Sequence, residues 1–104
     1  MAITRYTSPP ITLLVKGVNI VAADIYVTVK QGNVVFERTG DQLSVSASES
    51  DTQIIFYLSQ EEAAKFNSRA NAEIQVNWLI GGKRYATEIK EVCIYNNLLD
   101  EVLT

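Results

Sequence analysis

The sequence predicts a single all-β domain, and three observations lead to that prediction. From Ile11 onward, short runs of β-branched and aromatic residues alternate with polar residues at a period of two. Clusters of Gly, Asn, Asp and Ser separate these runs. The chain has 104 residues, of which 47% are hydrophobic and 20% charged, as is usual for one globular core. About seven short strands in this length indicate two packed sheets or a small barrel.

The first half of the chain contains four predicted strands of an antiparallel sheet. In each of them hydrophobic side chains occupy every second position, so one face of the strand turns to a core. Gly17, residues 31–33 and residues 39–41 favour turns, and residues 31–33 join the second and third strands as a hairpin. The four strands cover residues 11–15, 25–30, 34–38 and 43–47.

The middle of the chain predicts a central strand followed by a short helix. In residues 54–58, Ile54, Phe56 and Leu58 form one apolar row while the reverse side is also apolar, which is typical of a central strand. Ser59 is then followed three residues later by Glu62, the pattern of a helix N-cap. One or two helical turns are therefore expected to connect this strand to the next.

A hairpin is predicted in the last third of the chain. Residues 74–80 alternate most regularly, and the phase of the alternation places Trp78 in the core. Gly81-Gly82 is a strong signal for a two-residue hairpin turn, so residues 83–95 are expected to pair back as one strand. The alternation slips near residues 90–91, which predicts a β-bulge there.

The composition argues against catalysis and against tightly bound cofactors. The chain has no histidine, so the usual triads and the commonest metal ligand are missing. Its one cysteine, Cys93, lies between Val92 and Ile94 and is interpreted as a packed strand residue. Calcium binding by the acidic loop 49–51 is a weaker alternative. We expect no catalytic residue, no cofactor and no metal ion, and the protein is not expected to be an enzyme.

The charge pattern limits the classes of partner. The formal net charge is −3, and the 9 Lys and Arg residues are scattered. A nucleic-acid surface requires clustered positive charge, and so does an anionic membrane surface, so neither partner is expected. No small-molecule substrate is evident. Residues 1–6 do not resemble a signal peptide, and a cytoplasmic location is expected when the chain is synthesised.

The two ends of the chain are the candidate interaction surfaces. The domain is expected to span residues 1–104, with an extended N-terminal arm at residues 1–10 and an apolar C-terminal tail at residues 97–104. Short apolar termini on a folded domain can pack on neighbouring chains, or they can fold back on their own domain, and both arrangements stay open. The candidate interaction residues are Tyr6, Pro9, Pro10, Leu98, Leu99, Val102 and Leu103.

Six segments, in order along nearly the whole chain, resemble a group of short proteins encoded among tail and baseplate genes of phages and prophages of Gram-positive bacteria. They are ITRYTSPP (3–10), DIYVTVKQG (24–32), LSQEE (58–62), IQVNW (74–78), GKRYATEI (82–89) and NLLDEVL (97–103). The resemblance implies an immunoglobulin-like sandwich and a structural role in a tail or baseplate, within an assembled virion. It implies self-association or contact with other phage structural proteins, and no enzymatic residues.

Two further roles remain as alternatives. A small host-surface or glycan-binding module would use exposed aromatic side chains, for which the candidates are Tyr6, Tyr26, Tyr57 and Tyr85. A small regulator would bind one host protein. An enzyme is the least favoured class, because only carboxylates remain for acid–base chemistry.

Overall fold

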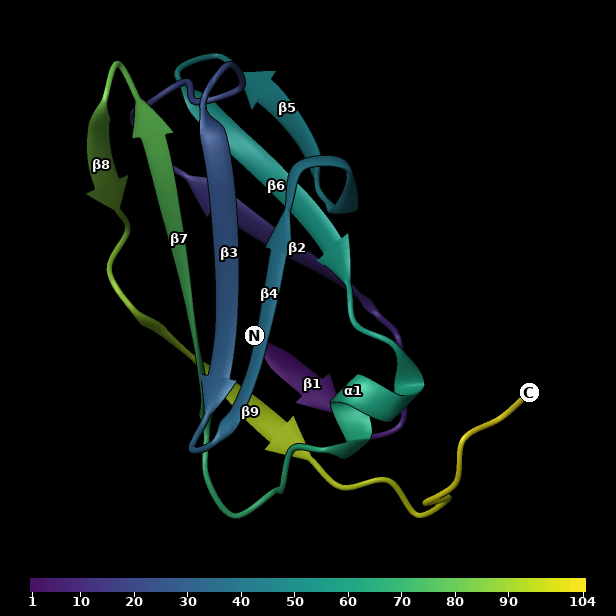
Figure 1. Ribbon diagram of the computed structural model, residues 1–104. Coiled ribbons are helices and arrows are strands. Elements are labelled where there is room, and N and C mark those ends of the chain that lie inside the picture. The colour runs from purple at the N-terminus through teal and green to yellow at the C-terminus, as the bar shows by residue number, and fades with distance from the viewer.

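Two β-sheets face each other in the computed structural model, which describes residues 1–104 (Figure 1). Their strands are β1 (Ala2–Thr4), β2 (Pro10–Val15), β3 (Asp24–Gln31), β4 (Val34–Thr39), β5 (Ser44–Ser48), β6 (Asp51–Tyr57), β7 (Ala72–Ile80), β8 (Lys83–Ala86) and β9 (Lys90–Tyr95). A short helix, α1 (Gln60–Ala64), and a 3-10 turn, η1 (Gly40–Gln42), complete the chain. The prediction of an all-β chain with one short connecting helix is confirmed.

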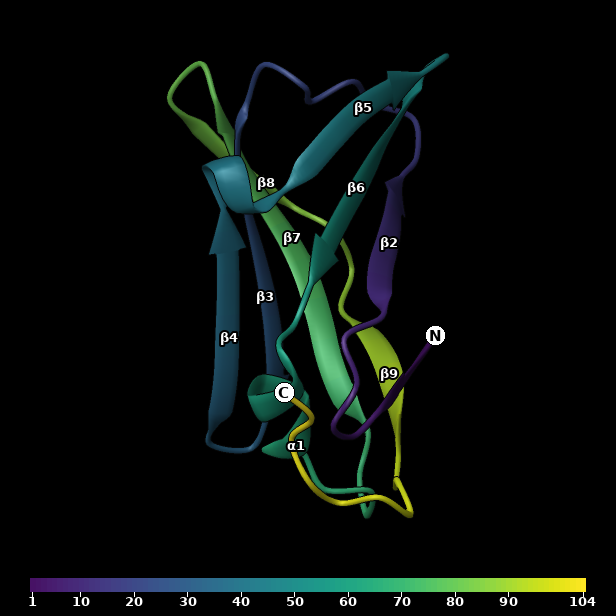
Figure 2. The ribbon, with the colours of Figure 1, turned by 90° about the vertical axis from the view of Figure 1, so that its right-hand side faces the viewer.

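The first sheet has the strand order β1-β9-β7-β3-β4, with β8 added beside β7, and the second has the order β2-β6-β5. Figure 2 shows the sheets as two layers, with β3, β4 and β7 in one and β2, β5 and β6 in the other. The expectation of a wholly antiparallel sheet is wrong at one place, because β1 pairs with β9 in parallel. Residues 2–4 of the predicted arm thus form an edge strand, and Ile3 is buried.

One hydrophobic core fills the space between the sheets. The hydrophobic side chains predicted from the alternation at every second position point inward. Val27 of the first sheet and Ile54 of the second are both completely buried. The prediction of a central strand is confirmed, because β6 lies between β2 and β5. Each fully buried aliphatic side chain contributes about 1.5–3 kcal/mol relative to exposure. The core consists of Ile3, Ile11, Leu13, Val15, Ile20, Ile25, Val27, Val29, Ile54, Phe56, Leu58, Ala63, Phe66, Ala72, Ile74, Val76, Val92 and Ile94.

The predicted Gly-Gly turn joins β7 to β8. Ile80 pairs with Lys83, so Gly81 and Gly82 are the two loop residues, and both have positive φ, at 59° and 75°. Two positive φ angles are what a type I′ hairpin turn requires. Because a side chain at such angles is strained, glycine is favoured at both positions.

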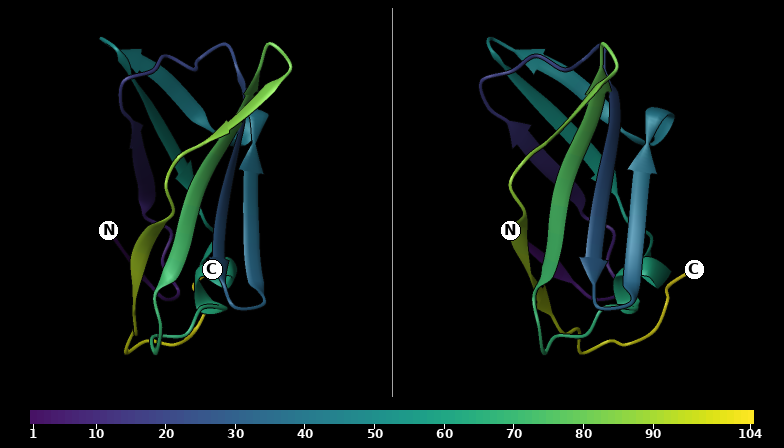
Figure 3. Two further views of the ribbon diagram at one scale, coloured as in Figure 1. Left: turned by 90° about the vertical axis from the view of Figure 1, so that its left-hand side faces the viewer. Right: turned by 60° about the vertical axis from the view of Figure 1, so that its left-hand side comes forward.

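The returning strand is split in two, and together with the short strand β1 this gives nine strands where about seven were predicted. Asn77 pairs with Ala86, but Ile74 pairs with Lys90, so three steps along β7 oppose four steps on the returning chain. This extra residue is the predicted register slip, placed between β8 and β9. Figure 3 shows β8 and β9 against opposite ends of β7. At the break the Thr87 hydroxyl accepts a hydrogen bond from the Val76 N–H at 3.1 Å.

Two side chains differ from their expected environment. Cys93 is a residue of β9 as predicted, but it is exposed and not packed, because Val92 and Ile94 on either side of it take the inward positions. Trp78 is only partly buried. It lies near the open end of β7, where its ring stacks on Tyr85 with centroids 5.9 Å apart.

A buried threonine ties the β2–β3 connection to the second sheet. Thr52 of β6 is fully buried, and its hydroxyl accepts from the Ile20 N–H at 3.0 Å and donates to the Val18 carbonyl at 2.8 Å. Both backbone groups belong to a segment without strand partners of its own, so this one side chain satisfies them. The bond also holds Ile20 in the core.

We expect Thr52→Val to destabilise the fold by about 1–3 kcal/mol, because it leaves a buried donor and a buried acceptor without partners. Thr52→Ser keeps the hydroxyl and serves as the matched control, with a loss below about 1 kcal/mol for one buried methyl group. The free energy of unfolding in denaturant measures both. A valine variant as stable as the serine variant would contradict the role assigned to the hydroxyl.

Candidate functional site

The N-terminal turn and the C-terminal segment meet beside α1 (Figure 1). Arg5 joins them: its guanidinium donates to the Ala64 carbonyl at 2.8 Å and to Asn96 Oδ1 at 3.3 Å. Asn97 Nδ2 in turn donates to the Arg5 carbonyl at 3.0 Å. The guanidinium also lies 5.3 Å from the centre of the Tyr6 ring. Residues from the two ends of the chain therefore build one surface around this arginine.

The helix α1 is fixed to the first sheet by an ion pair. Glu62 accepts from the Ser59 N–H at 2.8 Å while the Ser59 hydroxyl accepts from the Glu62 N–H at 3.1 Å, so the predicted N-cap is a complete capping box. The same Glu62 carboxylate pairs with Arg38 of β4 at 2.5 Å. It is the one ion pair in the chain, and both side chains are partly buried.

Gln60, the first residue of α1, holds the C-terminal tail. Its Nε2 donates to the Leu103 carbonyl, and its Oε1 accepts from the Leu103 N–H, each at 2.8 Å. This side-chain amide pairs with both polar groups of one backbone residue, as a neighbouring strand would. The tail is thus attached through its backbone, and its side chains are not needed for the attachment.

The apolar side chains of the tail face solvent. Leu98 is fully exposed, Leu99 is 49% exposed, and Val102 and Leu103 are 37% and 58% exposed. We name these four residues the terminal patch. The backbone of the tail folds back on its own domain, which is one of the two arrangements that the sequence left open. Its aliphatic side chains remain available to another molecule.

The N-terminal candidate interaction residues, Tyr6, Pro9 and Pro10, do not lie on one surface. Tyr6 lies in the turn next to the tail and is partly buried, with an unusual positive φ of 64°. Pro9 is partly buried, and Pro10 begins β2, where it pairs with Tyr57 of β6. The prolines therefore lead into the second sheet, and Tyr6 is the N-terminal candidate that the Arg5 hydrogen bonds bring to the tail.

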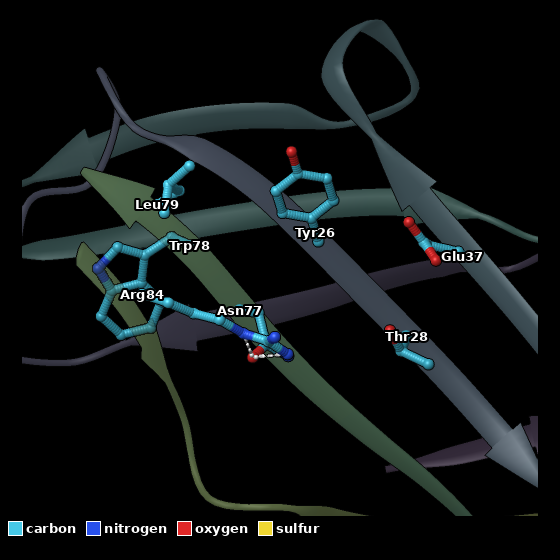
Figure 4. A pocket seen from close by; sticks show the side chains of 7 residues that line it. All are labelled: Tyr26, Thr28, Glu37, Asn77, Trp78, Leu79 and Arg84. Atoms are coloured by element: carbon cyan, nitrogen blue, oxygen red, sulfur yellow. Dashed lines mark hydrogen bonds between the residues drawn. The ribbon is translucent and has the colours of Figure 1, made fainter. Parts of the chain in front are cut away.

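A second candidate region is a shallow hollow of about 310 Å³ on the outer face of the first sheet (Figure 4). We name it the outer hollow. Residues of β3, β4, β7 and β8 line it, with the Tyr26 ring 40% exposed. Arg84 crosses from β8 and donates from Nε and Nη2 to Asn77 Oδ1, both at 3.2 Å. The lining residues are Tyr26, Thr28, Glu37, Asn77, Trp78, Leu79 and Arg84.

Sequence reasoning identified only part of this hollow. Tyr26 was among the candidate surface aromatics, whereas Trp78 was assigned to the core. The polar members Glu37, Asn77 and Arg84 come from three strands. The predicted Gly81-Gly82 hairpin already indicates that Asn77 and Arg84 are neighbours, but no local signal places Glu37 beside them. The pairing of β3 with both β4 and β7, together with that of β7 with β8, brings all three to one face.

The acidic loop 49–51 is used for structure. Asp51 Oδ1 accepts from the Gly17 N–H at 2.9 Å, which links the β5–β6 turn to the end of β2. No group of three or more His, Cys, Asp or Glu side chains is arranged to hold a metal ion. No helix of the chain has the length and apolar character needed to cross a membrane.

Comparison with models of known protein families and with curated proteins gives no match.

The clamp formed by Gln60 gives a direct prediction. Gln60→Ala removes both hydrogen bonds to Leu103, so the amides of residues 98–104 should become more mobile while the sheets are unchanged. Backbone ¹⁵N relaxation in solution measures this. Glu61→Ala is the matched control, because Glu61 is the exposed neighbour on the same helix. Equal mobility of the tail in both variants would show that the clamp does not hold it.

The Glu62–Arg38 pair predicts a pH dependence of stability. Partial burial raises the pKa of Glu62, but hydrogen bonds from Arg38 and Ser59 and the guanidinium charge outweigh this and lower the pKa below 4.5. Because the folded-state pKa is the lower one, the carboxylate stabilises the fold fully above pH 4.5, and this stabilisation is lost as pH falls through the folded pKa.

We therefore expect Glu62→Gln to cost about 1–3 kcal/mol of unfolding free energy above pH 4.5, and the difference from the wild type to shrink in more acidic solution. Denaturant unfolding at a series of pH values measures it, with Glu61→Gln as the control. A difference that stays constant through the acid range would mean that the charge of Glu62 is not involved.

Proposed function

We propose that the chain is a non-catalytic structural subunit of a phage tail or baseplate that docks on neighbouring proteins through the terminal patch. The observation that carries the proposal is the exposure of Leu98, Leu99, Val102 and Leu103 on a tail whose backbone is already anchored. The resemblance of six segments to tail- and baseplate-encoded proteins supports the same role. Its partners are other structural proteins of the particle or a second copy of this chain.

The fold that we propose is an immunoglobulin-like sandwich. In the variable type of that fold, one sheet holds strands B, E and D, and the other holds G, F, C and C′. Here β2-β6-β5 follows the first order and β9-β7-β3-β4 follows the second, with the connections in the same sequence. The short strand β1, parallel to the last strand, and the helix between β6 and β7 are compatible with this arrangement.

The energetics of the patch favour docking. Burial of one leucine side chain contributes about 1.5–3 kcal/mol, so four aliphatic groups provide enough to offset part of the cost of association. The Gln60 clamp lowers that cost further, because the tail is ordered before a partner arrives. Exposed aliphatic side chains that follow the polar contact of Arg5 with Asn96 along the chain are compatible with the apolar centre and polar rim of a protein interface.

The test replaces the most exposed leucines. In Leu98→Ser/Leu99→Ser we expect loss of self-association, or loss of capture of the proteins encoded beside this gene, without a change in stability. Light scattering after size-exclusion chromatography measures the first, and binding to the purified neighbours measures the second. Val21→Ser is the matched control, since Val21 is similarly exposed at 46% in the β2–β3 connection. A wild-type chain that stays monomeric and binds none of those neighbours contradicts the proposal.

A further inference from the structure

The outer hollow has the features of a ligand site, and they differ from those of the terminal patch. Its volume of about 310 Å³ is at the lower end of the range for small-molecule sites. Its lining includes the exposed Tyr26 ring, the partly buried Trp78 ring, one aliphatic side chain and several polar groups, whereas the terminal patch is aliphatic. In Figure 4 the Tyr26 ring lies between Glu37 on one side and Arg84 on the other.

The charges in the hollow have no ionic partners within the chain. The single ion pair of the protein is Arg38–Glu62, so neither Glu37 nor Arg84 is neutralised by a neighbour. Arg84 is nevertheless held in place, because two of its nitrogens donate to the Asn77 side chain. The third nitrogen, Nη1, makes no hydrogen bond and remains a donor. The hollow thus offers an oriented donor at one end and a carboxylate acceptor at the other.

The backbones of β4 and β8 are three strand spacings apart, about 14 Å, and their long side chains reach inward over β3 and β7. A ligand between them has to donate to Glu37, accept from Arg84 and present an apolar surface to Tyr26 and Leu79. A pyranose ring meets all three conditions, because its hydroxyls donate and accept at its rim while its C–H groups form an apolar face. Because Glu37 and Arg84 together carry no net charge, an uncharged ligand matches the overall charge of the hollow.

We propose that the outer hollow binds a neutral sugar of one or two pyranose rings. Tyr26 stacks against the C–H face of a ring, Glu37 and Thr28 bind hydroxyls on the β4 side, and Arg84, positioned by Asn77, binds hydroxyls on the β8 side. The site is open and shallow, so the expected dissociation constant is about 1–10 mM, a free energy of about 3–4 kcal/mol. Such a site gains useful affinity when many copies of the domain stand in one particle.

The test is titration of the ¹⁵N-labelled chain with methyl glycosides of glucose, galactose, mannose and N-acetylglucosamine, and with lactose and maltose, up to about 50 mM. At least one sugar should shift the amide signals of Thr28, Asn77, Leu79 and Arg84. Tyr26→Ala should weaken this binding about tenfold or more, because it removes the apolar ring face on which the sugar stacks. The amide spectrum itself reports whether the variant is folded.

Two matched variants sharpen the result. Tyr57→Ala removes a tyrosine that is 58% exposed on the other sheet and should bind the sugar like the wild type. Asn77→Ala frees Arg84 and should weaken binding with the fold intact. Three outcomes would overturn the proposal: no shift with any sugar, shifts that cluster outside the outer hollow, or binding that Tyr26→Ala leaves unchanged. None of these outcomes bears on docking through the terminal patch.

Discussion

The rest of the structure depends on the contact between the inner faces of the two sheets. With one cysteine, the chain has no internal disulfide, so packing has to offset the conformational entropy of folding, on the order of 100–200 kcal/mol for a domain of this size. Alternation at a period of two meets this requirement, because it turns every second side chain of both sheets toward one core. The opposite face of each strand does not pack in this core, so it can carry polar and aromatic groups.

Polar side chains secure the places where the chain passes between the sheets or leaves them. Thr52 holds the β2–β3 connection, and Glu62 holds α1 against β4. Gln31 of β3 holds the segment between α1 and β7. Its amide donates to the carbonyls of Asn67 and Ala70 and accepts from the Asn67 N–H, all within 2.9 Å. Each is a buried or half-buried group whose hydrogen bonds fix an irregular segment to the sheets.

The sequence predicts the elements whose signal is local. The inward rows of β2, β3, β6 and β7, the Gly-Gly turn and the N-cap of α1 could all be identified from spacing and residue type. The three-residue strand β1 could not, because it is too short to show a period and its partner lies at the far end of the chain. Cys93 shows an error of reasoning: the alternation that buries Val92 and Ile94 also turns Cys93 outward.

The same distinction explains the two candidate sites. The leucines of the terminal patch are neighbours in sequence, so an apolar tail could be predicted, although its attachment to Gln60 could not. The outer hollow takes residues from four strands, and its composition depends on which strands pair and in what register.

The two surfaces lie on different parts of the molecule. The molecule extends 45 Å along its longest axis, and Figure 1 shows the β7–β8 hairpin and the C-terminal tail at opposite ends of it. Substitutions at sites separated by more than about 10 Å, without shared partners, usually have additive effects. No side chain of the outer hollow forms a hydrogen bond or ion pair with α1 or the tail. A subunit docked through the terminal patch would therefore keep the outer face of its first sheet exposed, which is what a sugar-binding surface on an assembled particle requires.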